Sequence, residues 1–329
     1  MIYAALFVVA LAGALALMPM LARLGTRARL MDQPGKRKVH LQAIPRLGGV
    51  GVALSLTATL GMAVVIDVHG LATPSPQPQS LLPIFPAAIL VFAVGLWDDV
   101  SPVPALRKLA VQVVAAGIIV ASGILITRVT VFSHTYELGI YAFPLTALWI
   151  IVITNAFNLM DGLDGLAGGL VVIAASTCAV VLIVRGEQPT AMMLVALTGA
   201  TTGFLIYNFH PARIFLGDSG SLLAGFLLAV TAIIGRQKGA TTLATIVPLL
   251  IFALPLADAS FSIVRRLFTT GQAEVPQRSP ALARIFMPDQ AHIHHRLLAS
   301  GLSHRGAVLL LYALSALCAT AALLLMERP

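Results

Sequence analysis

About ten stretches of apolar residues, each close to the length that crosses a bilayer, follow one another along this chain. A membrane-spanning helix needs about 20 apolar residues. Only 10% of the residues are charged, against about 25% in a soluble domain. Because backbone in lipid must satisfy its own hydrogen bonds, we predict one all-α, polytopic membrane domain. The expected spans are roughly 2–22, 47–68, 81–97, 109–127, 142–159, 166–184, 190–209, 219–235, 242–261 and 306–326.

Lysine and arginine are divided unequally between the two ends of these spans. One set of loops holds 16 of the 21 basic residues, which predicts that this side is cytoplasmic and that both termini lie outside. This orientation also explains the net charge of +8, so no nucleic-acid partner is expected. The cytoplasmic loops are predicted at about 23–46, 98–108, 160–165, 210–218 and 262–305.

Two smaller features fit the same picture. Residues 128–143 alternate β-branched and aromatic side chains, which indicates a small external hairpin. Cys178 and Cys318 each lie inside an apolar run, so we interpret them as packing residues rather than as a disulfide or a metal site.

The most polar motif of the apolar region is NAFNLMDGLDGLAGG, residues 155–169. Asn155 and Asn158 share one face if the preceding helix reaches Asn158, because positions i and i+3 are neighbours on a helix. Asp161 and Asp164 follow in a glycine-rich turn without a basic residue. A polar turn between helices would explain one Asp-Gly pair, but two pairs favour an acidic ligand site.

Two further acidic motifs stand at predicted cytoplasmic helix ends. Asp98 and Asp99 point about 100° apart on a helix, so we expect them to have different tasks, one at a metal and one at a substrate; two acids at a helix end also occur by chance. Asn208 ends another span, and Asp218 follows in a Gly-Asp-Ser-Gly turn. Asp218 suits either a helix N-cap or a metal-phosphate site.

Two cytoplasmic loops carry basic motifs. In the first, His40, Arg46 and the pair Gly48-Gly49 suit an anion-binding loop, although the basic charge also serves orientation. The second holds the histidine cluster His292, His294 and His295 with Arg296. Zinc, a diphosphate and a pH-sensitive polar loop are the three interpretations of this cluster.

Together these motifs resemble the polyprenyl-phosphate N-acetylhexosamine-1-phosphate transferases, a family that includes WecA/TagO-type enzymes and MraY translocases. The resemblance rests on RKVHLQAIPRLGG, GLWDDV, NAFNLMDGLDGLAGG, NFHPARIFLGDSGS, the 255–266 stretch and DQAHIHHRLL, in family order from about residue 36 to 298. The last of these is similar to the WecA/TagO branch. Some WecA-type enzymes have a further helix beyond the point where this sequence ends.

The resemblance implies transfer of a sugar 1-phosphate from a UDP-N-acetylhexosamine to undecaprenyl phosphate in the bacterial inner membrane, for cell-envelope glycan synthesis. UDP-GlcNAc is the expected donor, with UDP-GalNAc, UDP-FucNAc, UDP-QuiNAc and UDP-MurNAc-pentapeptide as alternatives. Mg²⁺ is the expected cofactor, with Mn²⁺ as the alternative. A homodimer is an expectation by family analogy alone. The competing function is a transporter of anionic metabolites, which predicts broken helices with polar residues at mid-membrane.

The resemblance also assigns roles to residues. Asp218 is the expected metal ligand, with Asp98 or Asp99 near the lipid phosphate and Asp161 completing the catalytic set. The nucleotide pocket is expected at Asn158, Asp161, Asn208 and Phe215. The diphosphate or sugar contacts are expected at His292, His294, His295 and Arg296, and the remaining predicted substrate-binding residues are His40, Arg46, Asn155 and Asp164.

Overall fold

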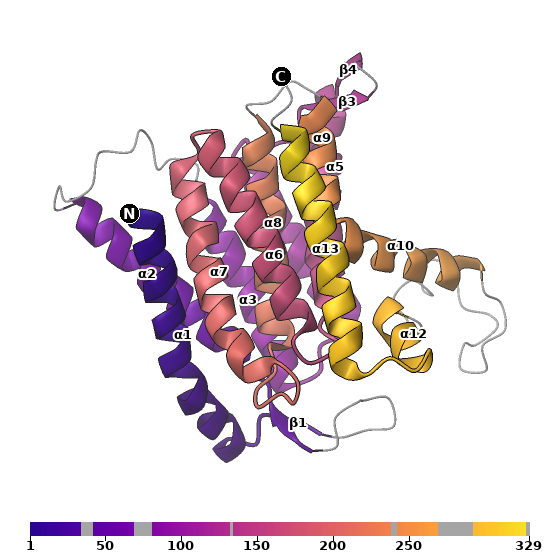
Figure 1. The fold of residues 1–329 in the computed structure, drawn as a ribbon. Coiled ribbons are helices and arrows are strands. Elements are labelled where there is room, and N and C mark those ends of the chain that lie inside the picture. The colour runs from indigo at the N-terminus through magenta and orange to yellow at the C-terminus, as the bar shows by residue number, and fades with distance from the viewer. Residues whose placement is uncertain (34–41, 69–80, 132–133, 238–241, 269–291, 327–329) are drawn as a thin grey trace.

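The computed structural model describes residues 1–33, 42–68, 81–131, 134–237, 242–268 and 292–326 as a helical bundle (Figure 1). The helices are α1 (Ile2–Arg27), α2 (Gly48–Val68), α3 (Ile84–Val100), α4 (Ala105–Ala121), α5 (Ala142–Leu159), α6 (Leu166–Val184), α7 (Gln188–Asn208), α8 (Gly217–Gln237), α9 (Thr242–Ile251), α10 (Ala253–Phe268), α12 (Ile293–Ala299) and α13 (His304–Met326). The 3₁₀ turn η2 (Gly139–Tyr141) precedes α5.

Helix α8 forms the centre of the bundle. Every residue from Gly217 to Gly235 is buried except Asp218. Helices α2, α3, α5 and α6 all contact α8, and α1 packs against α7 further out. A helix that is apolar on all sides belongs in the interior. Asp218 therefore stands at the one end of the central helix where a polar side chain can leave the core.

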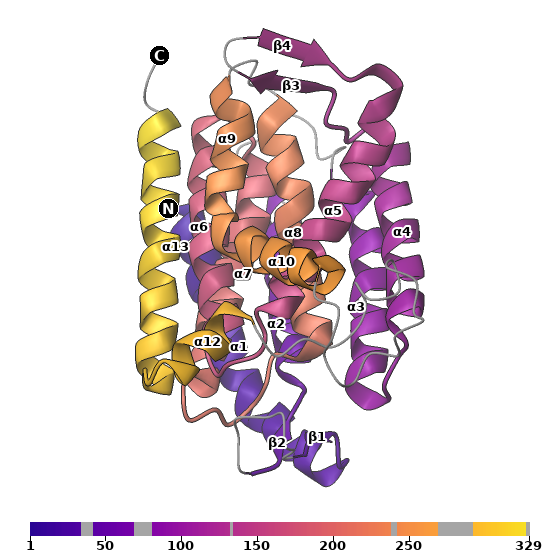
Figure 2. The ribbon, with the colours of Figure 1, turned by 90° about the vertical axis from the view of Figure 1, so that its right-hand side faces the viewer.

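The two ends of the bundle differ in character. At one end, β3 (Arg128–Val131) and β4 (His134–Glu137) form an antiparallel hairpin that pairs Arg128 with Glu137 (Figure 2). At the other end lie α12 and the short antiparallel pair β1 (Met31–Asp32) and β2 (Ile44–Pro45). The hairpin predicted over 128–143 is thus confirmed, and both cysteines are free, as predicted.

Among the described residues, seven helices are long and apolar enough to cross a membrane: α1, α2, α5, α6, α7, α8 and α13. Helices α3 and α4 are slightly shorter, with 17 residues each. The structure agrees with an all-α, polytopic membrane protein.

The single span expected at 242–261 is wrong, because this segment breaks into α9 and α10 at Phe252. Pro255 explains the break, since proline has no N–H to donate to the carbonyl four residues earlier and its ring collides with that carbonyl. After the break, α10 leaves the bundle sideways, whereas α9 continues the direction of its neighbours (Figure 1).

Candidate active site

The acidic motifs meet at the bundle end opposite the β3–β4 hairpin. The end of α3, the start of α4, the α5–α6 turn and the start of α8 all lie there, so residues far apart in the sequence become neighbours (Figure 2). This arrangement agrees with the prediction that the acidic motifs share one side of the bundle.

Asp99 fixes the start of α8. Its Oδ1 accepts the Asp218 N–H at 2.8 Å and its Oδ2 accepts the Ser219 N–H at 3.0 Å. Two carboxylate bonds to free helix N–H groups make Asp99 an N-cap supplied by another helix. Gly217 permits this approach, because its φ is +72° and a Cβ there would lie 2.5 Å from Asp99 Oδ1. Asp99 thereby holds the backbone from which the Asp218 side chain extends.

Asp98 contacts other groups than Asp99 does. This is expected, because the side chains of adjacent residues point about 100° apart on a helix. Its Oδ1 accepts the Val103 N–H at 2.7 Å, and its Oδ2 lies 3.4 Å from the Lys108 Nζ. Lys108 also donates to Asp218 Oδ2 at 2.8 Å. Lys108 therefore joins the two carboxylates across α3, α4 and α8.

Sequence reasoning missed this role of Lys108, since it counted the residue only as an orientation charge. The available signal was its place in the first turn of the helix that follows the Asp98-Asp99 pair. No local pattern could show that the distant Asp218 would meet it.

Asp161 faces the same group of charges from the turn after α5. The pKa of Asp161 is raised to about 8, chiefly by burial and then by the neighbouring Asp218 and Asp99 carboxylates, while the Gly217 N–H and Arg46 act in the opposite direction. Arg46 itself is held in an ion pair with Asp32. The carboxylates of Asp161, Asp99 and Asp218 thus lie near one another at this end of the bundle.

The two predicted amides lie on α5, as expected, but have different partners. Asn155 donates to Gln112 Oε1 at 2.5 Å, and Gln112 is a second residue that sequence reasoning missed. Asn158 Nδ2 donates to Ser221 Oγ at 2.9 Å, which links α5 to the first turns of α8. Asn158 is half-buried and stands one turn before Asp161.

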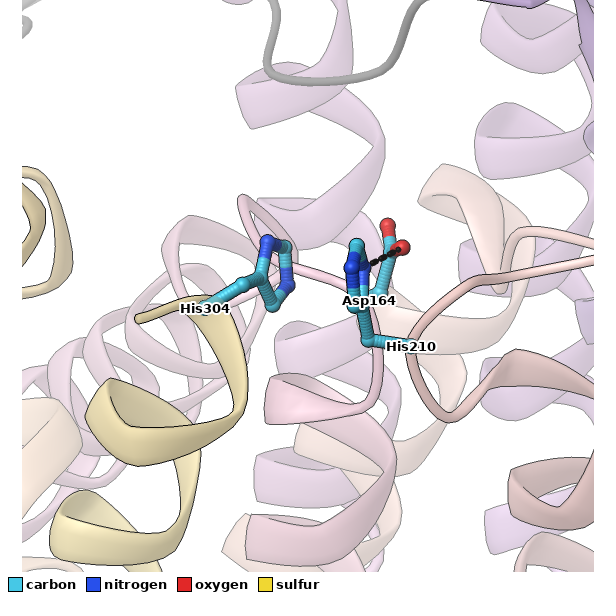
Figure 3. A group of neighbouring side chains, drawn as sticks. All are labelled: Asp164, His210 and His304. Atoms are coloured by element: carbon cyan, nitrogen blue, oxygen red, sulfur yellow. Dashed lines mark hydrogen bonds and ion pairs between the residues drawn. The ribbon is translucent and has the colours of Figure 1, made fainter. Parts of the chain in front are cut away.

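Asp164 belongs to a second group, on the other side of the α5–α6 turn. Its Oδ2 lies 2.8 Å from His210 Nδ1 and accepts the Ala212 N–H at 3.1 Å. The His210 ring stacks on His304 with 4.2 Å between centroids and 15° between planes (Figure 3). Asp164, His210 and His304 are close enough to hold a metal ion.

Asn208 and Phe215 lie in the segment that joins α7 to α8. The buried Asn208 accepts the Gly165 N–H and donates to the Ile214 carbonyl, both at 2.9 Å, so its amide ties two loops together. Phe215 is half-buried, and its backbone N–H donates to the Pro45 carbonyl at 2.8 Å.

The first cytoplasmic loop motif enters α2 at Gly48-Gly49, but the N–H groups of this pair are not available to an anion. Gly48 and Gly49 donate their N–H groups to the carbonyls of Phe215 and Leu216, at 2.9 and 2.8 Å, and are therefore occupied. The glycines serve close packing of α2 against the start of α8. His40, the other polar residue of that loop motif, lies outside the described residues.

The predicted histidine cluster surrounds the start of α12. His292 precedes the helix and is held by Asp258 of α10, while His294 is buried with its ring 4.4 Å from that of the half-buried His295. Arg296 is exposed. The pKa of His294 is lowered to about 3, chiefly by burial and then by the neighbouring His295 and His292, so His294 is neutral at physiological pH.

Asp98 and Asp218, whose carboxylates both lie beside Lys108 Nζ, have the type of oxygen donor that a hard divalent cation binds. Carboxylate oxygens are the ligands that Mg²⁺ prefers, usually one or two of them together with substrate phosphates. Burial is the main cause of the raised pKa of Asp161; the Asp218 and Asp99 carboxylates add to it, and a cation bound here would oppose their contribution.

Comparison with known proteins shows which sequences this chain resembles. Residues 81–236 match the model of glycosyl transferase family 4. The chain is 36% identical, over 97% of its length and 84% of the relative, to the probable undecaprenyl-phosphate N-acetylglucosaminyl 1-phosphate transferase of Bacillus subtilis strain 168. It is 33% identical to the decaprenyl-phosphate N-acetylglucosaminephosphotransferase of Mycobacterium leprae, covering 88% of this chain and 75% of that one. It is 28% identical to the undecaprenyl-phosphate alpha-N-acetylglucosaminyl 1-phosphate transferase of Escherichia coli K12, covering 91% and 77%.

Proposed function

The chain belongs to glycosyl transferase family 4, and we propose that it transfers N-acetylglucosamine 1-phosphate from UDP-GlcNAc to a polyprenyl phosphate. The names of three relatives support the sugar, and they give undecaprenyl or decaprenyl phosphate as the acceptor. Undecaprenyl phosphate in a bacterial cytoplasmic membrane is the acceptor we expect. The observation that carries the proposal is the position of Lys108 between Asp98 and Asp218.

The proposed reaction exchanges one phosphoanhydride bond for another. An oxygen of the polyprenyl phosphate attacks the sugar-bearing phosphorus of UDP-GlcNAc, the bond from that phosphorus to the bridging oxygen breaks, and UMP leaves with this oxygen. A phosphate monoester is already largely ionised at pH 7, so its attack needs no general base. The protein must instead bring anionic groups together and stabilise the charge that they share.

The described residues can divide this task. Lys108 supplies a fixed positive charge beside the carboxylates of Asp98 and Asp218. We assign Asp218, with Asp98, to hold Mg²⁺, which would neutralise the diphosphate charge when bound. Asp99 caps α8 and so orients Asp218. On this account Asp99 acts mainly by positioning rather than as a ligand.

The substrates would approach this centre from two sides. The half-buried Asn158 and Asp161 are proposed to contact the nucleotide, together with Phe215 and the Asp164–His210 pair. The neutral imidazole of His294 and the exposed Arg296 are proposed to contact the diphosphate or the sugar. The isoprenoid chain would remain in the bilayer, which explains why the site lies at the end of a membrane bundle.

The test is UMP release by the purified protein in detergent, with undecaprenyl phosphate and a panel of UDP-sugars, in Mg²⁺ and in EDTA. We expect release that needs both lipid and Mg²⁺, is fastest with UDP-GlcNAc and is lost in Asp218→Asn. Glu137→Gln is the matched control, because Glu137 is an exposed carboxylate at the other end of the bundle. Folded protein that releases no UMP with any donor would contradict the proposal and favour transport.

A further inference from the structure

A buried carboxylate outside the centre described above holds the histidine cluster in place. Asp258 on α10 is 2% exposed. Its Oδ2 lies 2.7 Å from His292 Nδ1, and its Oδ1 accepts the Ile293 N–H at 2.7 Å. A buried carboxylate is costly unless its oxygens are paired. Both Asp258 oxygens are paired, and both bonds go to the first residues of the α12 segment.

The helix break makes this contact available. Because the chain changes direction at the break that Pro255 explains, α10 runs sideways. The buried residues of α10 follow one another at helical spacing: Pro255, Asp258, Ala259 and Ser262. Asp258 lies one turn after the break, on the face that α10 turns inward. The carboxylate of α10 thus reaches a segment that begins 34 residues later in the sequence.

Because Asp258 holds the start of α12, it also restricts the position of His294, the second residue of that helix. The rings of His292 and His294 are parallel within 3°, with 5.7 Å between centroids. His294 is 2% exposed, and neither of its ring nitrogens has a hydrogen-bond partner among the described residues. Its Nε2 lies against Gly162, where a Cβ would collide with it. Gly162 directly follows Asp161, so this unpaired nitrogen borders the proposed active site.

An unpaired, buried imidazole is a group prepared for a ligand. A buried polar atom without a partner is unfavourable, and a phosphate oxygen or a sugar hydroxyl beside Gly162 could supply the missing partner. Burial lowers the pKa of His294 to about 3, which keeps the ring neutral. It can then donate from one nitrogen and accept at the other, provided that the ring is held in one orientation.

We propose that Asp258 is a positioning residue for the transfer reaction, which acts through His292 and the start of α12 to hold His294 against Gly162, where it contacts the donor substrate. This inference rests on the proposed function. Asp258 does not itself touch the substrate. It determines which nitrogen of His292 carries the proton and where α12 begins, in the way that a carboxylate behind a functional histidine fixes its tautomer and orientation.

The test is a double-mutant cycle on UMP release with Asp258→Asn and His294→Ala. Asparagine can still accept the Ile293 N–H through its carbonyl, but its amide can only donate to His292 and so reverses the tautomer. We expect Asp258→Asn to lower kcat about 10- to 100-fold, with KM for UDP-GlcNAc and the melting temperature close to wild type. The double variant should be no slower than His294→Ala alone, because both changes act through one group.

Each other outcome decides against the proposal. Wild-type kcat in Asp258→Asn would show that the Asp258–His292 contact only fastens α12, as would a loss confined to thermal stability. Independent, multiplying losses in the double variant would show that Asp258 does not act through His294. Asp258→Glu, which keeps the charge, should recover part of kcat that Asp258→Asn loses. An inactive wild-type protein would instead refute the proposed function, so the two failures are distinguishable.

Discussion

Lys108 and Asp218 are 110 positions apart in the sequence, yet Lys108 Nζ donates to Asp218 Oδ2 at 2.8 Å. The same ammonium group lies 3.4 Å from Asp98 Oδ2. One cation thus links the end of α3 and the start of α4 to the start of the central helix α8. The proposed reaction brings a lipid phosphate and a diphosphate to this point, where fixed charge must offset their repulsion.

Replacing Lys108 tests this charge. Lys108→Met should lower kcat about 100-fold, as expected for removal of one preorganised electrostatic contact, because the carboxylates would then repel the diphosphate. Arg107→Met is the matched control, since Arg107 is the adjacent exposed basic residue. UMP release by both variants checks the prediction. Equal activity of the two variants would contradict a catalytic role for Lys108.

Asp99 should matter more for stability than Asp98. Asp99→Ala removes both N-cap bonds of α8, and loss of an N-cap costs roughly 1–2 kcal/mol. Asp98→Ala removes one bond to the Val103 N–H and the ion pair with Lys108, but no helix cap, and should lower the melting temperature less. Thermal unfolding in detergent, with ligand and divalent cation absent, compares the two variants. A larger loss in Asp98→Ala would contradict the capping role of Asp99.

The raised pKa of Asp161 predicts how stability depends on pH. Between 3.8 and about 8 the folded protein binds more protons at this group than the unfolded chain does. Stability of the protein in EDTA should therefore fall as the pH rises through this window. Asp161→Asn should make the fall shallower, and Mg²⁺ should do the same in the wild type. Unfolding midpoints measured across this window test both effects; identical slopes in wild type and variant would be the contrary result.

Two glycines of α2 allow a test of how closely α2 packs on α8, one as the test position and the other as the control. A Cβ at Gly49 would collide with the Gly220 backbone, whereas a Cβ at Gly61 would meet nothing within 4 Å. Gly49→Ala should lower the melting temperature and the yield of folded protein. Gly61→Ala should be neutral or stabilise by roughly 0.5–1 kcal/mol, because alanine is the better helix former. Equal effects would show that the close approach is not needed.

The sequence predicted features that depend on local pattern. The apolar stretches predicted a helical bundle. The polar motifs at the helix ends predicted that the acidic residues would gather at one end of that bundle. The β3–β4 hairpin, the free cysteines and the shared helix of Asn155 and Asn158 followed from residues close in sequence.

Features that depend on packing between distant helices could not be predicted. Lys108 meets Asp218 only because α4 lies near α8, and Asp99 caps α8 only because α3 lies beside it. The sequence could not show that the Gly48 and Gly49 N–H groups would bond to carbonyls of the α7–α8 segment rather than stay available to an anion. The break at Phe252 had a local signal in Pro255, which the apolar character of the stretch obscured.

The central claim is that the sugar leaves the donor together with one phosphate. UDP-GlcNAc labelled with ³²P on the sugar-bearing phosphate tests it most directly, with undecaprenyl phosphate as acceptor and Asp218→Asn as the inactive control. The account predicts that the label moves to the lipid fraction and that unlabelled UMP is released in equal amount. Label recovered as soluble UDP beside a glycosylated lipid, or label that never leaves the intact donor, would contradict it.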